Sequence, residues 1–172
     1  MTQTLFSFLS QWDGKDTKSL TGLFHDEAGN PEFLNSMVRM AALEECQRGA
    51  TWLLKHHFDG GGVAPSEELA QQHISQVADT GDWQTRLHVL QYLEHLDLPD
   101  DSEALQSEFV EASLKSEKPF VRAWAWHALC VLAERFPGRN QATRRRLSEA
   151  LSRETAASVK VRIRKALQRL NG

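Results

Sequence analysis

Residues 121–129 read Val-Arg-Ala-Trp-Ala-Trp-His-Ala-Leu, and their apolar members recur at the three- and four-residue spacing of an α-helix. The same pattern of small or apolar residues returns 36 positions earlier and 38 positions later, with a basic residue in the second position each time: Arg86, Arg122 and Lys160. A period of about 40 residues is typical of helical hairpins stacked into a solenoid. The three apolar ladders are Thr85, Val89, Tyr92, Leu93 and Leu96; Val121, Ala125, Ala128, Leu129 and Leu132; and Val159, Ile163, Ala166, Leu167 and Leu170.

Helix signals cover most of the rest of the chain. Pro119 suits the first position of a helix that Pro137-Gly138 ends, and Asp82 suits the cap of a helix that begins at Trp83. We find no alternating strand pattern bounded by turn signals. The sequence therefore predicts an all-α chain, with helices starting at Pro31 after an Asn30 cap, over 50–58, from 66 to 77, and over 83–96, 103–114, 119–135, 140–153 and 155–171.

The segment Lys118-Pro119-Phe120-Val121-Arg122, followed by Ala125 and Leu129, resembles the HEAT-repeat family. The copy at Val159-Lys160 matches that pattern partly, and the copy at Thr85-Arg86 matches it more weakly, so the resemblance covers residues 83–172. It implies an α-solenoid of helical hairpins, an α/α superhelix, and does not fix an activity. We expect one HEAT-like repeat domain over residues 1–172, with residues 1–30 as an irregular N-terminal cap.

Composition favours a globular domain, because hydrophobic residues make up 41% of the chain and charged residues 25%. No apolar run approaches the length of about 20 residues that a membrane-spanning helix needs, and no basic residue precedes the apolar cluster at Leu5–Leu9 as it would in a secretory signal. We therefore expect a cytoplasmic protein. Cys46 and Cys130 are far apart in no metal-like spacing, which favours two reduced, packed thiols.

The charges of the chain are divided unequally between its ends. Residues 1–118 hold 8 Lys and Arg against 20 Asp and Glu, a balance of −12, whereas residues 119–172 hold 12 against 3, a balance of +9. Second helices of such hairpins usually line the concave surface in this architecture. The acidic helix with Glu103, Glu108 and Glu111 would then adjoin a basic one. The candidate partner-binding residues are Arg139, Arg144, Arg145, Arg146, Arg153, Arg162, Arg164 and Trp126.

Several functions fit this basic end. The leading hypothesis is a non-enzymatic interaction or scaffold module that binds an acidic protein segment. The alternative is a nucleic-acid-binding protein similar to the HEAT-like DNA glycosylases, which the Arg cluster and the pair Trp124 and Trp126 favour and the acidic two-thirds of the chain opposes. Self-association through the oppositely charged ends is a third interpretation. A solvated polar cap on a terminal repeat would need the same residues without binding anything.

Other constellations favour structural roles. We expect core packing for Trp124 and Trp126, and a structural ladder for the recurring base. Gln84, His88, Gln91 and His95 share one polar helical stripe, which we expect to be solvated or at an interface, and the two histidines are about 10 Å apart along the axis, too far to share a metal. Glu44 and Glu45 beside Cys46 would raise the pKa of its thiol. The sequence offers no catalytic set, cofactor site or metal site.

Overall fold

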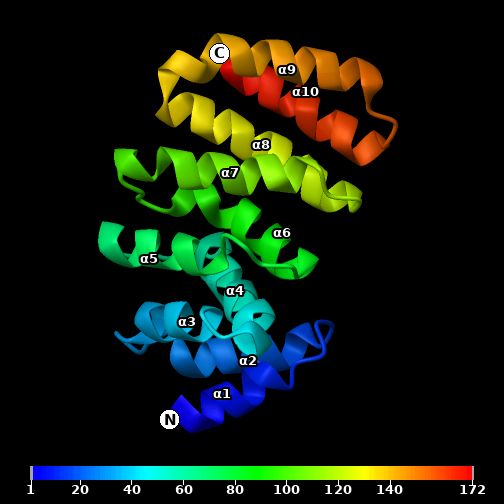
Figure 1. Cartoon of the computed structure of the whole chain (residues 1–172). Coiled ribbons are helices and arrows are strands. Elements are labelled where there is room, and N and C mark those ends of the chain that lie inside the picture. The colour runs from blue at the N-terminus through cyan, green and yellow to red at the C-terminus, as the bar shows by residue number, and fades with distance from the viewer. Residues whose placement is uncertain (1, 172) are drawn as a thin grey trace. The chain divides into compact units, whose positions relative to one another are not determined.

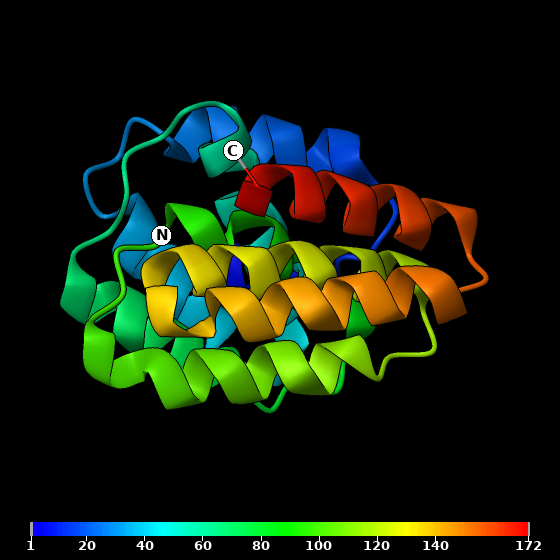
Figure 2. The same ribbon diagram turned by 90° about the horizontal axis from the view of Figure 1, so that it is seen from above.

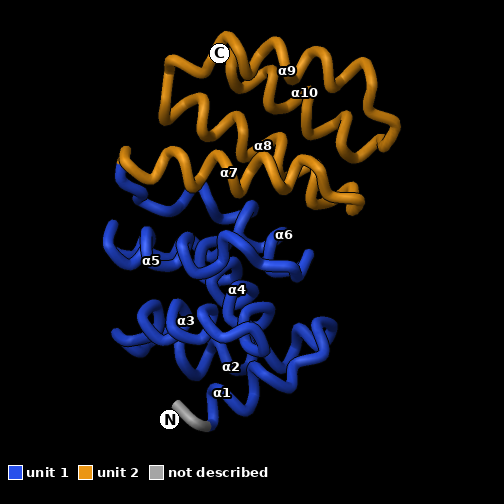
Figure 3. Tube along the Cα trace, in the orientation of Figure 1, with its two compact units in different colours: residues 1–99 blue, residues 100–172 orange. Residues whose placement is uncertain are grey.

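The structure is a computed structural model that describes residues 2–171 (Figure 1). Ten α-helices and three 3-10 helices occupy these residues, and none of these residues forms a strand. The all-α prediction is therefore confirmed. The chain divides into two compact units, residues 1–99 and residues 100–172 (Figure 3).

The first unit is built around helix α4 (Glu44–Asp59), which buries side chains on several of its sides. Four helices pack against it: α1 (Thr2–Ser10), α2 (Thr17–Glu27), α3 (Phe33–Ala41) and α6 (Trp83–Tyr92). Helix α5 (Glu67–Val77) packs against α3, and the 3-10 helix η1 (Leu93–His95) continues α6. The stretch predicted as one helix over 83–96 thus tightens in its last turn.

The N-terminal 30 residues are more regular than the sequence suggested. The structure forms α1 and α2 in place of an irregular cap, and both helices contact α4. Asp16 caps α2 by accepting a hydrogen bond from the backbone N–H of Ser19 at 3.3 Å. Leu9 and Leu20 are buried, at 1% and 0% exposure, so this region belongs to the core of the first unit.

Close packing of α1 on α4 depends on Gly49. A Cβ at this position would lie 2.9 Å from Cδ2 of Leu9, a distance at which the leucine has to move. Gly49 and Leu9 are both buried in the helix pair. A glycine in the middle of α4 therefore allows the two helices to approach, despite its low helix propensity.

The second unit is built around helix α8 (Pro119–Arg135), against which α7 (Glu103–Leu114), α9 (Asn140–Arg153) and α10 (Ala157–Asn171) pack. The 3-10 helices η2 (Asp100–Ser102) and η3 (Pro137–Arg139) precede α7 and α9. In the view of Figure 2, α8 (yellow) lies between α9 (orange) and α10 (red), and both helices pack against it. The core between them contains Ala123, Cys130, Ala133, Leu147, Val159, Ile163, Ala166 and Leu170.

The helix ends test the capping predictions. Pro119 is the first residue of α8, and Asp82 caps α6 by accepting from the Thr85 N–H at 2.8 Å, both as predicted.

Three helices begin elsewhere than predicted. The helix predicted from Pro31 begins at Phe33, because Asn30 Oδ1 accepts from the Glu32 N–H and holds a turn. α4 begins at Glu44, six residues before the predicted start. Before α10, the side chain of Glu154 and not that of Thr155 accepts the backbone N–H groups, those of Thr155 and Ala156.

The recurring base has the same structural role in two copies. Arg86 donates to the carbonyl of Thr80 at 2.7 Å, and Arg122 donates to the carbonyl of Ser116 at 2.9 Å, each six residues upstream. Arg122 also donates to the carboxylate of Glu154 at 3.2 and 3.3 Å. Arg86 and Arg122 therefore have the structural role that was predicted for the recurring base.

Three pairs of helices that are two apart in the chain run in the same direction: α4 with α6, α7 with α9, and α8 with α10. In the first unit, α4 meets α6 through Arg48 with Asp82 near their starts and Phe58 with Tyr92 near their ends. In the second unit, α8 meets α10 through Trp124 with Arg162 and then Glu134 with Arg169. α7 and α9 are related in the same way by their ion pairs.

Candidate interaction surface

Ion pairs with α7 neutralise two of the arginines that the sequence predicted as partner-binding residues. Arg139 donates to Glu103 at 2.5 Å, and Arg146 donates to both carboxylate oxygens of Glu111 at 2.5 and 2.9 Å. The hydrogen bonds from Arg146 hold the pKa of Glu111 below its ordinary value, and those to Glu111 raise the pKa of Arg146. The acidic and basic helices expected to line a groove are therefore paired with each other at these two positions.

Arg144 has a structural contact of its own. Its guanidinium donates to the backbone carbonyl of Leu170 in the last turn of α10. This carbonyl belongs to the C-terminal group of a helix that lacks an intrahelical partner, so the contact ties the end of α10 to α9. Of the three consecutive arginines, Arg144 and Arg146 thus hold neighbouring helices, whereas Arg145 is exposed.

Four cations of α9 and α10 remain available to a partner. They are exposed, and their side chains make no hydrogen bond or ion pair with residues 2–171: Arg145, Arg153, Arg164 and Lys165. Arg153 shares the flank of Arg139 and Arg146 at seven-residue spacing, but α7 ends at Leu114 and has no carboxylate opposite it. We call these four residues the basic surface.

The two tryptophans of α8 have different surroundings. Trp126 is half-buried and packs against the core of the second unit, which fits its predicted packing role and removes it from the exposed basic residues. Trp124 is half-buried at the edge of α8, where the guanidinium of Arg162 lies 3.9 Å from its ring centre. His127 meets the same ring edge-on at 5.2 Å. The sequence selected Trp126, whereas the structure combines Trp124 with one of the candidate arginines.

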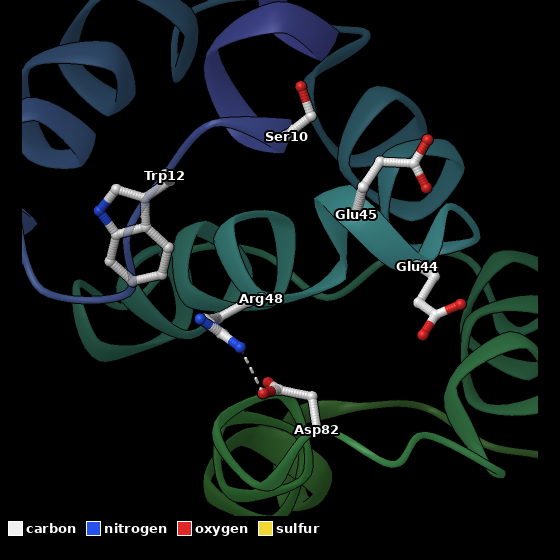
Figure 4. A pocket seen from close by; sticks show the side chains of 6 residues that line it. All are labelled: Ser10, Trp12, Glu44, Glu45, Arg48 and Asp82. Atoms are coloured by element: carbon white, nitrogen blue, oxygen red, sulfur yellow. Dashed lines mark hydrogen bonds and ion pairs between the residues drawn. The ribbon is translucent and has the colours of Figure 1, made fainter.

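The first unit carries a separate acidic cleft of about 460 Å³ (Figure 4). Arg48 in its floor donates to Asp82 at 2.8 Å, and Trp12 forms another wall with its indole N–H bonded to the carbonyl of Asp16. Burial opposes ionisation of Asp82, but hydrogen bonds from Arg48 and Thr85 outweigh it and lower its pKa. The described lining residues are Ser10, Trp12, Glu44, Glu45, Arg48 and Asp82.

The described lining residues of the cleft include no serine–histidine pair. The only hydroxyl among its described lining residues, that of Ser10, donates to the Ser7 carbonyl, and none of these residues is a histidine that could act as a base. Its one cation is already bonded to Asp82. The Arg48–Asp82 pair, which the sequence did not reveal, joins α4 to the cap of α6 much as Arg122 joins α8 to the carboxylate before α10.

Two histidines, His73 and His88, are buried in the first unit. His88 was expected to be solvated or at an interface; it is buried under α4, and its Nδ1 lies 3.1 Å from the Thr51 hydroxyl. His73 lies 2.6 Å from the Tyr92 hydroxyl. Burial lowers the pKa of each imidazole to about 4. His95 stays exposed and stacks on Phe58, so the predicted stripe is divided between core and surface.

Cys46 and Cys130 form no disulfide and both are buried, as predicted. Burial, and secondarily the charge of Glu45, raises the pKa of Cys46 to about 11. The direction agrees with the sequence argument, although the larger cause is burial. Neither thiol is therefore placed as a nucleophile.

Comparison with known proteins adds no identification. No protein-family model, no curated protein sequence and no solved structure matches the chain significantly. Within residues 2–171, no helix combines the length and the apolar character needed to cross a bilayer.

Proposed function

We propose that this chain is a non-enzymatic, HEAT-like helical-repeat scaffold whose basic surface binds an acidic segment of a partner protein. The repeat interpretation is supported by the period of 36 to 38 residues and by Arg86 and Arg122, which bond carbonyls six residues upstream. Parallel alternate helices within each unit are typical of such repeats. A helical-repeat fold does not by itself specify a ligand.

The observation that carries the proposal is the uncompensated charge of α9 and α10. Helix α10 has five Lys and Arg and no Asp or Glu. Arg145, Arg153, Arg164 and Lys165 stay exposed after the ion pairs of neighbouring residues are formed. Clustered charge of one sign attracts and orients an oppositely charged partner, mainly by raising the association rate.

A protein partner is favoured over a nucleic acid by two features. Residues 1–99 hold 6 Lys and Arg against 14 Asp and Glu, a balance of −8, which would repel a duplex that extends beyond the basic surface. The tryptophans are also poorly placed for base stacking, because Trp126 packs on the core and Arg162 covers a face of Trp124. The glycosylase-like alternative therefore has less support than an acidic protein segment.

Charge reversal with a matched control tests the proposal. One variant carries Arg145→Glu, Arg164→Glu and Lys165→Glu; the control carries Lys15→Glu, Lys18→Glu and Arg39→Glu, three exposed cations of the first unit. Both variants change the net charge by the same amount. Anisotropy of a fluorescein-labelled, Glu-rich peptide is measured at low and moderate salt, together with a short DNA duplex.

We expect the first variant to bind the peptide roughly tenfold more weakly, since three exposed ion pairs contribute about 0.5 kcal/mol each. The control should change by less than about twofold. Equal weakening in both variants would reduce the effect to overall charge and contradict a local site. Tighter, salt-sensitive binding of the duplex would instead favour the nucleic-acid alternative.

A further inference from the structure

Two further hollows adjoin the acidic cleft of the first unit. One, of about 360 Å³, shares Glu44 and Asp82 with the cleft and extends along the loop before α6 to Asp79. The other, of about 300 Å³, shares Trp12 with the cleft and extends to Phe8 on α1. All of their described lining residues belong to the first unit. We call this row of three hollows the acidic groove.

Carboxylates predominate in the lining of the acidic groove, whereas Arg48 is the one cation among its described lining residues. Asp82, Asp79 and Asp13 each have a cation nearby, which for Asp82 is Arg48 itself. Asp16 is engaged as the cap of α2. Two carboxylates of the lining therefore remain without a partner. The six lining carboxylates are those of Asp13, Asp16, Glu44, Glu45, Asp79 and Asp82.

Glu44 and Glu45 are these two uncompensated carboxylates. Both are exposed, and neither side chain makes a hydrogen bond or ion pair with residues 2–171. Acidic residues are common in the first turn of a helix because they interact favourably with its dipole, as Glu67 and Glu68 do in α5. Glu44 and Glu45 in addition line the cleft, on the side opposite Trp12 (Figure 4).

Trp12 gives the groove a flat apolar wall. Its indole N–H donates to the carbonyl of Asp16 at 2.9 Å, and its ring meets that of Trp52 at 6.4 Å, so the side chain is held in place. It is half-buried and lines both the cleft and the hollow that extends to Phe8, which is 37% exposed. An aromatic face attracts cations, and it stacks with the planar guanidinium of arginine better than with the ammonium of lysine.

We infer that the acidic groove binds an extended, arginine-containing segment of a partner protein. Glu44 and Glu45 supply the complementary charge, and Trp12 stacks on a guanidinium. Alternate side chains of an extended chain point to one side, so they can enter successive hollows. The carboxylates repel acidic segments and nucleic acids, which the groove therefore rejects.

This inference concerns a different site from the proposed function. The basic surface lies on α9 and α10 of the second unit, whereas the acidic groove lies in the first unit. The chain then carries two surfaces of opposite charge, each suited to a different partner. Two such surfaces on one chain are what a scaffold needs in order to hold two proteins.

Three labelled peptides of equal length test the groove. They share a Gly- and Ser-containing background and carry three Arg, three Lys or three Gln residues at alternate positions. The protein variants are Glu44→Gln with Glu45→Gln, and separately Trp12→Leu. The matched control is Glu67→Gln with Glu68→Gln, which removes the same charge from the first turn of α5. Anisotropy is measured at low and moderate salt.

We expect wild type to bind the Arg peptide at least tenfold more tightly than the Gln peptide. Glu44→Gln with Glu45→Gln should weaken binding of the Arg peptide roughly fivefold, and the control should change it by less than about twofold. Trp12→Leu should remove the preference for the Arg peptide over the Lys peptide. Circular dichroism checks that this variant is folded, and Trp12→Phe, which keeps an aromatic face, should retain part of the preference.

Three outcomes would overturn the inference. Folded wild type that does not bind the Arg peptide at low salt would exclude the groove as a site and leave the basic surface unaffected, because a Glu-rich peptide tests that surface. Equal weakening by the variant of Glu44 and Glu45 and by its control would reduce the effect to overall charge. Sedimentation would reveal a dimer at low salt; its loss both in the Glu44 and Glu45 variant and in the charge-reversal variant of the basic surface would assign the groove to a second copy of the chain.

Discussion

Arg146 on α9 donates two hydrogen bonds to the carboxylate of Glu111 on α7, at 2.5 and 2.9 Å. The two residues are 35 positions apart, and the pair of Arg139 with Glu103 repeats the relation at 36 positions. This separation is close to the sequence period of 36 to 38 residues, and each cation lies beside a carboxylate of the helix two earlier in the chain. The pairs distinguish arginines that join helices from those that remain available to a partner.

Replacing Arg146 and Arg145 separately should separate these two roles. We expect Arg146→Gln to lower the free energy of unfolding by about 0.5 kcal/mol, because both side chains of the pair are about two-fifths exposed and solvent weakens the pair. The thermal midpoint should fall by roughly 1 to 2 °C. Arg145→Gln should leave the midpoint unchanged and weaken peptide binding. Thermal and peptide titrations on both variants check this, and equal loss of stability would contradict the assignment.

Acid should remove the contribution of the Arg146–Glu111 pair. The pKa of Glu111 is lowered from 4.5 in the folded chain by the hydrogen bonds from Arg146. The unfolded chain therefore binds a proton more readily, so the stabilisation is complete above about pH 4.5 and is lost as the pH falls through the folded pKa. Urea unfolding of wild type and Arg146→Gln should give curves that converge as the pH falls below about 4.5. A difference that stays constant would contradict the charge argument.

Buried histidines should make the first unit sensitive to mild acid. Burial lowers the pKa of His73 and His88 from 6.5 to about 4 in the folded chain. Above about pH 6.5 both histidines are neutral in the folded and in the unfolded chain, so the free energy of unfolding does not depend on their protonation. Below that value the unfolded chain takes up protons first, which lowers the free energy of unfolding by at most about 3 kcal/mol for each histidine. Urea midpoints near pH 7 and pH 5 measure the loss.

Amide replacements provide the controls for this pH dependence. His73→Gln and His88→Asn keep a polar atom near the bonded ring nitrogen and cannot titrate. The double variant should lose less stability than wild type over the same pH interval, whatever its stability at neutral pH. His95→Gln should behave like wild type, because His95 is exposed. A double variant with the wild-type pH loss would assign the effect to other groups.

Much of the helical organisation could be predicted because it is encoded locally. Pro119 as the first residue of α8 and Asp82 as the cap of α6 mark these helix starts locally, and both positions were predicted correctly. The N-terminal helices were missed because α1 has no acidic residue in its first turn and no basic residue in its last, and only its apolar spacing indicates it. The start of α2 could have been predicted from the sequence, because Asp16 is a typical capping residue and caps this helix. The Glu154 carboxylate serves the start of α10 from outside the helix, which spacing rules do not predict.

The sequence predicted that α9 and α10 are rich in basic residues, but it did not predict which of these residues bond to neighbouring helices. A helical wheel shows that Arg144, Arg145 and Arg146 fan around α9, but it does not show which neighbour each one meets. The repeat period applied to charged residues would have paired Arg139 with Glu103 and Arg169 with Glu134, which are 36 and 35 positions apart. The same period relates Thr51 to His88, 37 positions apart, and so explains why His88 is buried.

Two glycines should respond in opposite ways to a larger side chain. Gly22 lies in the middle of α2 with no atom within 4 Å of a built Cβ, whereas a Cβ at Gly49 would lie 2.9 Å from Leu9. Gly22→Ala should therefore stabilise the first unit by about 0.5 to 1 kcal/mol through helix propensity. Gly49→Val should destabilise it by roughly 1 to 3 kcal/mol, because α1 has to move away from α4. Urea unfolding measures both, and a stable Gly49→Val variant would contradict the close approach of these helices.

The two thiols should resist alkylation until the chain unfolds. Cys46 and Cys130 are both buried, and the pKa of Cys46 is raised to about 11, so only about one thiol in a thousand is ionised at pH 8. We expect intact mass to show no adduct after brief iodoacetamide treatment of native protein and two adducts in urea.

The Gly49→Val variant provides a comparison for this experiment, because displacement of α1 would expose Cys46, whose thiol contacts the Phe6 carbonyl at 3.8 Å. That variant should gain one adduct under native conditions, at Cys46. Rapid modification of wild type at either thiol would contradict the packing described for that unit.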